Sequence, residues 1–123
     1  MANAPVPSRL CPALEVLLGQ VREAVLKLAS APQDQAALRD IGLVTGRILD
    51  LLEENRAILK AADRLYEAAF ALQDVRAKRS RSARVTDRAV ESRAEALHLA
   101  LAGFRESLGS AKPNARGTAL GLS

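Results

Sequence analysis

The chain has 123 residues, enough for one domain, and carries 18 Lys and Arg against 14 Asp and Glu, a formal net charge of +4. Residues 75–88 hold six of the basic residues and one acidic residue, so the rest of the chain, with twelve basic and thirteen acidic residues, is nearly neutral. This excludes a protein that is basic over its whole surface. Because the chain has three aromatic residues, its core is expected to consist of Leu, Ala, Val and Ile, which favours packed helices over a β-sandwich.

The first predicted helix spans residues 10–29, after an N-terminal segment, residues 1–9, that is expected to be flexible. Its apolar residues recur at spacings of three and four, which is typical of a helix with one buried face. The sequence SAPQD then predicts a helix end and a new start, because Ser30 and Gln33 have capping-box spacing and Pro32 suits a first turn. The apolar face consists of Leu10, Leu14, Leu17, Leu18, Val21, Val25 and Leu28.

The second predicted helix is long, from residue 32 to about residue 78, or roughly 70 Å at 1.5 Å per residue. Its apolar residues fill three rows with a seven-residue repeat, whereas a two-stranded coiled coil needs two such rows. The third row predicts neighbours on both sides of this helix, as in a helical bundle. Gly42 and Gly46 weaken the helix, and a break at residues 42–46 is the alternative. The rows are Val44, Leu51, Ile58, Leu65 and Leu72; Ile48, Asn55, Ala62 and Ala69; and Thr45, Leu52, Leu59, Tyr66 and Gln73.

The third predicted helix begins after a cap at Thr86 or Asp87 and ends before Gly109. Residues 109–123 are small, polar and glycine-bearing, so a disordered tail is expected. The predicted fold is therefore all-α, a three-helix chain with one long central helix, in which residues 10–108 form an antiparallel bundle. The apolar residues of the third helix are Val90, Ala94, Leu97, Leu101, Phe104 and Leu108.

Dimerisation is expected to complete this bundle. The first and third helices can each cover half of the long helix, which leaves each half with one neighbour where three apolar rows call for two. A homodimer on a two-fold axis would bury the remaining face, and Asn55 would meet its own copy there. A break at residues 42–46 would instead allow a compact four-helix monomer. The residues of the long helix expected to contact a partner helix are Ile58, Leu65 and Leu72.

Catalytic and metal-binding motifs such as HExxH, CxxC, GxSxG and GxxxxGK[ST] are absent from the sequence. An enzyme, a cofactor and a metal site are therefore not expected, and His98 is interpreted as a helical surface residue. The lone Cys11 has no second cysteine to pair with in the chain, which fits a reducing, cytoplasmic environment. The apolar segment 41–52 contains Arg47 and Asp50, so no membrane span is expected, and the N-terminus does not resemble a secretory signal.

The basic segment has three interpretations. Its cations could neutralise several phosphates of a nucleic acid, although the segment has no aromatic residue for stacking and no Asn or Gln to contact bases. They could also bind an acidic protein, or simply form a solvated joint between helices that is dispensable for folding. The basic residues are Arg76, Lys78, Arg79, Arg81, Arg84 and Arg88.

Residues 53–72, EENRAILKAADRLYEAAFAL, resemble the asparagine-centred helical stretch of flagellar export chaperones. The resemblance rests on Glu54, Asn55 and Arg56, followed by an Ala- and Leu-rich helix. It implies a small all-helical bacterial protein of the cytoplasm that binds an export client through an apolar C-terminal helical face. The matching face in this sequence consists of Leu97, Leu101, Phe104 and Leu108. The expected function is a non-enzymatic helical protein–protein interaction module, an adaptor or chaperone, and the alternative is a small nucleic-acid-binding protein that uses residues 76–88.

Overall fold

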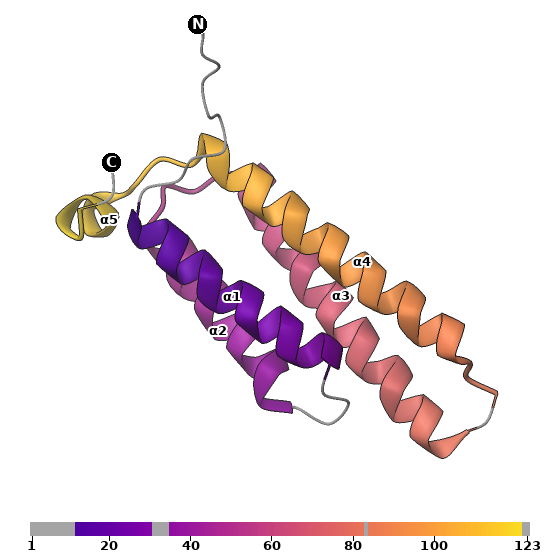
Figure 1. The fold of residues 1–123 in the computed structure, drawn as a ribbon. Coiled ribbons are helices and arrows are strands. Elements are labelled where there is room, and N and C mark those ends of the chain that lie inside the picture. The colour runs from indigo at the N-terminus through magenta and orange to yellow at the C-terminus, as the bar shows by residue number, and fades with distance from the viewer. Residues whose placement is uncertain (1–11, 31–34, 83, 122–123) are drawn as a thin grey trace, which may run out of the picture.

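The computed structural model describes residues 12–30, 35–82 and 84–121, and in these ranges the chain is helical without a β-strand. The helices are α1 (Pro12–Ser30), α2 (Gln35–Asp50), α3 (Arg56–Arg81), α4 (Asp87–Ser107) and α5 (Ala115–Ala119), with a 3-10 turn, η1 (Leu108–Ser110), after α4 (Figure 1). The all-α prediction is confirmed. The prediction of three helices is wrong, because the described chain contains five α-helices.

The four long helices form two pairs, α1 with α2 and α3 with α4, and the members of each pair lie side by side along most of their length (Figure 1). Packing within a pair is more extensive than packing between the pairs. The core between them is aliphatic apart from one aromatic ring, Phe104, as the composition predicts. Its most buried large side chains are Val21, Val25, Leu28, Ile41, Ile48, Ile58, Leu65, Leu72, Leu97, Phe104 and Leu108.

The predicted long central helix is interrupted at residues 51–55 and is therefore two helices, α2 and α3. Asn55 has an extended backbone (φ −145°, ψ 116°), and its side-chain oxygen accepts hydrogen bonds from the amides of Ala57 and Ile58. These are the hydrogen bonds that an N-cap residue accepts. Asn55 therefore caps the start of α3 and does not lie in an apolar row. The predicted alternative, a break at Gly42 and Gly46, is also wrong, since both glycines lie inside α2.

Gly42 has a packing role that explains a glycine within a helix. A Cβ atom at this position would lie 3.2 Å from the ring of Tyr66 in α3, closer than most real contacts. The absence of a side chain lets the Tyr66 ring lie against the α2 backbone.

The ends of the remaining helices agree with the sequence more closely. α1 covers the predicted first helix from Pro12 onward, whereas Leu10 and the Pro32–Gln33 part of the predicted capping box lie outside the described residues. Thr86 caps α4 by accepting a hydrogen bond from the amide of Ala89, as predicted. Ser30, predicted to begin the capping box of the next helix, is instead the last residue of α1, and its hydroxyl donates to the Leu26 carbonyl oxygen.

The tail differs from the predicted disordered segment. Residues 109–121 include part of η1 and all of α5, and they lie against the connection between α2 and α3. The Glu53 amide donates to the Lys112 carbonyl at 2.7 Å, and the Asn114 amide donates to the Leu51 carbonyl at 3.0 Å. These backbone bonds hold the tail in place although its composition is small and polar. Residues 1–9 and 122–123 lie outside the described chain.

Candidate interaction site

The residues predicted to contact a partner helix lie in the core of the chain itself. Ile58, Leu65 and Leu72 of α3 are at most 1% exposed, because α2 and α4 cover them. The break at residues 51–55 supplies the second neighbour that an unbroken helix would have lacked. The prediction that these side chains form a free docking face is therefore not met in this arrangement. The same holds for Leu97, Phe104 and Leu108, which are buried, and largely for Leu101, which is half-buried.

A different set of apolar side chains remains exposed on α2 and α3. Leu43 is 54% exposed, Leu59 40%, Tyr66 43% and Phe70 55%. We call these four residues the α2–α3 strip. The strip contains two of the three aromatic residues of the chain, and the third, Phe104, is fully buried. Exposed aromatic side chains that lie together are characteristic of protein interfaces.

Helix geometry places the α3 members of the strip on one flank. Leu59 and Tyr66 are seven residues apart, and Phe70 follows Tyr66 by one turn. Leu43 lies next to Gly42, against which the Tyr66 ring packs. A hollow of about 450 Å³ lies between the two helices at this point, lined by Leu38, Arg39, Gly42, Leu43, Tyr66 and Gln73.

Gln73 adds a polar group to this hollow. Its side-chain oxygen Oε1 is buried and has no hydrogen-bond partner among the described residues. An unsatisfied buried acceptor costs free energy. The hollow thus combines apolar area with one polar side chain in its lining.

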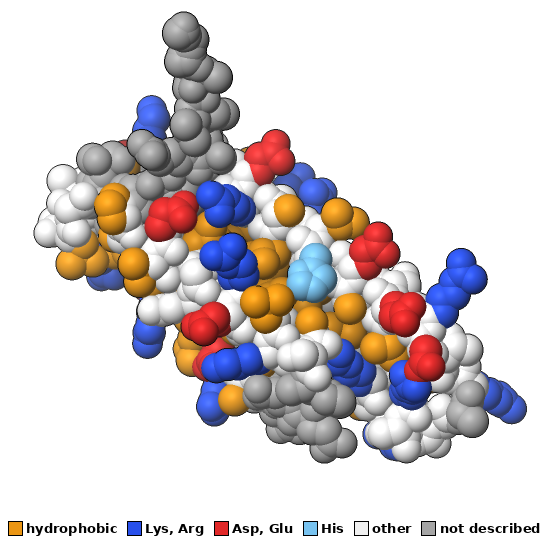
Figure 2. Space-filling model, in the orientation of Figure 1, with side chains coloured by type: hydrophobic (Ala, Val, Ile, Leu, Met, Phe, Trp, Pro, Cys, Tyr) orange, Lys and Arg blue, Asp and Glu red, His pale blue; other side chains and the backbone are white. Residues whose placement is uncertain are grey.

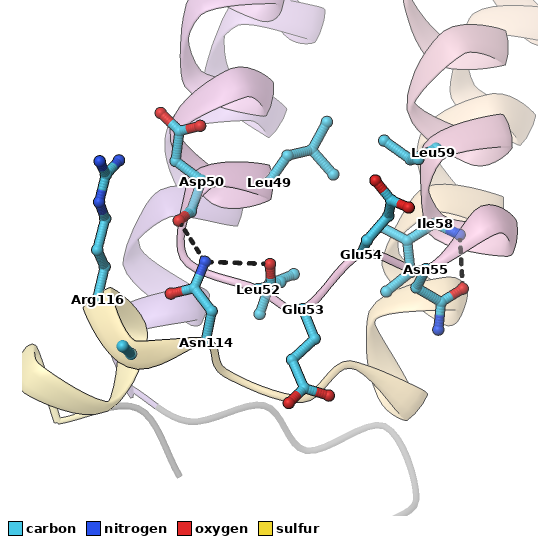
Figure 3. A pocket seen from close by; sticks show the side chains of 11 residues that line it. Leu49, Asp50, Leu52, Glu53, Glu54, Asn55, Ile58, Leu59, Asn114 and Arg116 are labelled. Carbon is cyan, nitrogen blue, oxygen red and sulfur yellow. Dashed lines mark hydrogen bonds between the residues drawn. The ribbon is translucent and has the colours of Figure 1, made fainter.

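A second hollow, of about 530 Å³, lies where α2, the 51–55 connection and the tail meet (Figure 3). Leu49 and Leu59 line its apolar side, while Glu53, Glu54 and Arg116 stand at its polar side (Figure 3). Three or more metal-ligating side chains do not come together anywhere in the described chain. The hollow therefore extends the apolar surface between α2 and α3 and offers no arrangement for metal chemistry.

The basic segment is divided between three structural settings. The Arg76 guanidinium donates to the carbonyl oxygens of Leu28 and Ala29 at the end of α1, and its partial burial lowers the pKa of this group below the usual value. Lys78 pairs with Asp74 at 3.0 Å, and Arg79 pairs with Asp87 across the α3–α4 connection. Arg76 does not have the solvated side chain expected of a dispensable joint, because it joins the two helix pairs. The remaining cations, Arg81, Arg84 and Arg88, are exposed.

His98 is exposed on α4, as predicted, beside a small hollow of about 170 Å³ between α1 and α4. Figure 2 shows this histidine among apolar side chains on the face that α1 and α4 form. Arg22 and Arg105 also line the hollow, and Arg105 lies 3.5 Å from Glu15. No nucleophile is placed next to this histidine among the lining residues, so the hollow provides no catalytic pair.

Sequence reasoning missed Leu43 and Phe70 as surface residues. It placed Leu59 and Tyr66 in the third apolar row but expected that row to be covered on both halves of the helix. The row is buried at Thr45 and Leu52 in the first half and exposed at Leu59 and Tyr66 in the second half. A seven-residue repeat identifies a face, but it does not tell which part of that face is covered.

Comparison with protein-family models, with curated proteins and with solved structures found no match to this chain. None of the described helices combines the length and the apolar character that a membrane crossing requires.

Proposed function

We propose that the protein is a non-enzymatic helical interaction module that binds an amphipathic helix of a protein partner along the α2–α3 strip. The observation that carries the proposal is the exposure of Tyr66 and Phe70, two of three aromatic residues, on one flank of α3. Aromatic side chains supply most of the binding free energy at many interfaces when a partner removes them from water. An adaptor or an export chaperone of the flagellar type, in the bacterial cytoplasm, would have such a surface.

The size of the strip suits one short helix. From Leu59 to Phe70 the helix rises roughly 16 Å, about three turns, so a partner helix of about three turns would cover it. Exposed charges, among them Asp63 and Glu67, lie beside the apolar residues and would form the rim of the interface.

A crosslinking experiment tests the proposal. A photoreactive amino acid, p-benzoylphenylalanine, would replace Phe70 in one variant and Leu99, an even more exposed apolar residue on α4, in the control. We expect a partner to crosslink to position 70 and not to position 99, and Tyr66→Ala to weaken binding of the purified partner at least tenfold. Equal labelling from both positions, or unchanged affinity, would argue against the strip.

Self-association is one form of the same proposal, since a second copy presents the same strip. A homodimer through the strip is expected to depend on Tyr66 and Phe70 and not on the buried residues Ile58 or Leu65. Sedimentation of Phe70→Ala beside Leu99→Ala measures this, because both changes remove an exposed apolar side chain and only one lies in the strip.

A nucleic-acid-binding function remains the second candidate, supported by the exposure of Arg81, Arg84 and Arg88 around the α3–α4 connection. Lys78 and Arg79 already pair with acidic residues, and Arg76 is bound to carbonyl groups, so fewer cations are free than the sequence suggests. A filter-binding titration against salt decides between the candidates. Affinity at near-physiological salt that falls when all three arginines become serine would favour nucleic acid.

A further inference from the structure

We infer that the part of the tail after η1, residues 111–121, is a latch that keeps α2 and α3 separate. Release of this latch lets the α1–α2 pair exchange between two copies of this chain. The partner is a second copy, and its α3–α4 pair receives the α1–α2 pair in place of the chain's own. We call the arrangement in Figure 1 the closed chain. The inference does not depend on the α2–α3 strip.

The sequence of the joint permits a continuous helix. No Gly or Pro occurs between Arg47 and Arg81, and the apolar rows continue from α2 into α3 with the same seven-residue repeat. Leu51 and Ile58, on the two sides of the joint, belong to one row. Nothing in the local sequence except the good capping residue Asn55 requires the helix to stop here. The break must therefore be stabilised by contacts from elsewhere in the chain.

The tail supplies those contacts. The Asn114 side-chain amide donates to the carbonyl oxygens of Asp50, at 2.7 Å, and Leu52, at 3.2 Å (Figure 3). The Asn114 backbone amide donates to Leu51, and the Lys112 carbonyl accepts from the Glu53 amide. Four consecutive residues, Asp50 at the end of α2 and the first three residues of the joint, thus bond to two residues of the tail.

The bond from the Glu53 amide to the Lys112 carbonyl cannot coexist with an unbroken helix, because this amide has a single hydrogen to donate. In a continuous helix the carbonyl groups of residues 50–52 would accept bonds from amides four residues later, and the Glu53 amide would donate to residue 49. The tail and the continuous helix therefore compete for the same backbone groups. A ligand that binds one of two states shifts the population toward it, and here the ligand is part of the chain.

Gly117 fits the tail to the joint. This residue is buried, and a Cβ atom built on it would collide with the Leu51 carbonyl oxygen. Any side chain at position 117 would force the tail away from the joint. Position 117 requires glycine because of this close contact and not because of its backbone conformation, since the backbone of residue 117 is helical.

Release of the tail has a defined consequence because the two helix pairs are linked at this joint and pack more within themselves than against each other. Straightening the joint into one helix of roughly 70 Å would carry α1 and α2 away from α3 and α4. The apolar faces so exposed, including Ile58, Leu65 and Leu72, would be covered by the matching pair of a second copy. The exchanged dimer keeps the core contacts of the closed chain, although they now form between two copies. The conformation of the joint therefore decides the equilibrium between the closed monomer and the exchanged dimer.

The experiment compares four full-length chains and one truncation by sedimentation velocity. We expect the truncation after residue 110, and Gly117→Leu in the full chain, to shift the protein from its 13.1 kDa monomer toward a dimer, with a dissociation constant at least tenfold lower than that of the unmodified chain. Asn114→Ala should act in the same direction. Circular dichroism verifies that each variant remains helical.

Arg56→Pro is the matched control. Position 56 is the first residue of α3, where proline is favourable, and the preceding Asn55 is already extended as proline requires. Proline in the middle of a continuous helix would instead clash with residue 52 and break it. Adding Arg56→Pro to Gly117→Leu should therefore return the protein to monomer.

Distances between spin labels identify the exchanged form. Arg39 and Tyr66 line the same hollow in the closed chain, so labels there lie close together, whereas a continuous helix would separate them by about 40 Å. Labels would be placed at Arg39→Cys and Tyr66→Cys with Cys11→Ser, and labelled chains diluted with unlabelled ones. The long distance in the Gly117→Leu dimer is the expected result. A variant that stays monomeric, or a dimer with the short distance, would overturn the inference.

Discussion

Two joints, one before α3 and one after it, are held by different kinds of interaction. The α3–α4 joint, residues 82–86, contains Ser82 and Thr86, whose side chains accept hydrogen bonds from nearby amides. The α2–α3 joint, residues 51–55, is bound by the tail, more than fifty residues later in the chain. The first joint is specified locally and the second by tertiary contacts, which is why the sequence predicts one and misses the other.

The first prediction concerns a substitution that disrupts only the α2–α3 joint, and it has the largest expected effect on stability. Gly117→Leu should displace the tail and remove its hydrogen bonds to the joint, at a cost of about 3 kcal/mol in the free energy of unfolding of the closed chain. Denaturant unfolding at protein concentrations too low for dimerisation measures this, and hydrogen exchange in the same monomeric sample should show faster exchange at the Glu53 amide. The α3–α4 joint should keep its protection.

Gly103→Ala is the control for that change. Gly103 lies in α4 with nothing within 4 Å of a Cβ atom built on it, so alanine should stabilise the helix by up to about 1 kcal/mol. A loss of stability at position 103 equal to that at position 117 would mean that glycine replacement destabilises the chain for a reason other than the contact between the tail and the joint.

This contrast explains which features of the fold the sequence predicts and which it does not. The all-α class, α1 and the start of α4 were predictable, because apolar spacing and a capping residue coincide there. The candidate interaction site was less predictable than the fold. Periodicity correctly identified Ile58 and Leu65 as apolar-face residues, but whether a helix of the same chain or a partner covers that face depends on where the chain turns.

Asn55 shows the physical reason. An asparagine in an apolar row can mark either a polar contact inside an interface or the start of a helix, and both use its side-chain oxygen. The choice depends on the tail, whose composition predicted disorder. A segment of small and polar residues gains its order here from backbone hydrogen bonds, which leave no pattern in the side chains.

The second prediction concerns the tie between the two helix pairs. Replacing Arg76 by Met keeps most of the apolar stem but leaves the Leu28 and Ala29 carbonyl groups without their charged donor. Hydrogen bonds to charged groups contribute about 1.5 to 3 kcal/mol, so we expect a loss of about 2 kcal/mol in thermal or denaturant unfolding. Lys78→Met, a change at an exposed residue two positions along α3, should cost no more than about 0.5 kcal/mol. Equal effects of the two changes would contradict the structural role of Arg76.

The third prediction compares the capping residues of the two joints directly. Asn55→Ala and Thr86→Ala each remove a side-chain acceptor at a helix start and should each cost about 1 kcal/mol. They should differ in association, because loss of the Asn55 cap also favours the continuous helix whereas loss of the Thr86 cap does not. Sedimentation at several protein concentrations distinguishes the two, and identical behaviour would remove the distinction between the joints.

The smallest effect is expected at the ion pair that spans the α3–α4 joint. Arg79 and Asp87 are 45% and 71% exposed, and exposed pairs contribute little because water and salt screen them. Arg79→Gln should therefore lower the free energy of unfolding by no more than about 0.5 kcal/mol, and raising the salt concentration should shrink even this difference. The reason is that the joint is already fixed by the Ser82 and Thr86 side chains, which bond to backbone amides without any help from charge. A loss well above 1 kcal/mol that persists at high salt would show that this joint, too, depends on a contact between distant residues, and the contrast with residues 51–55 would then disappear.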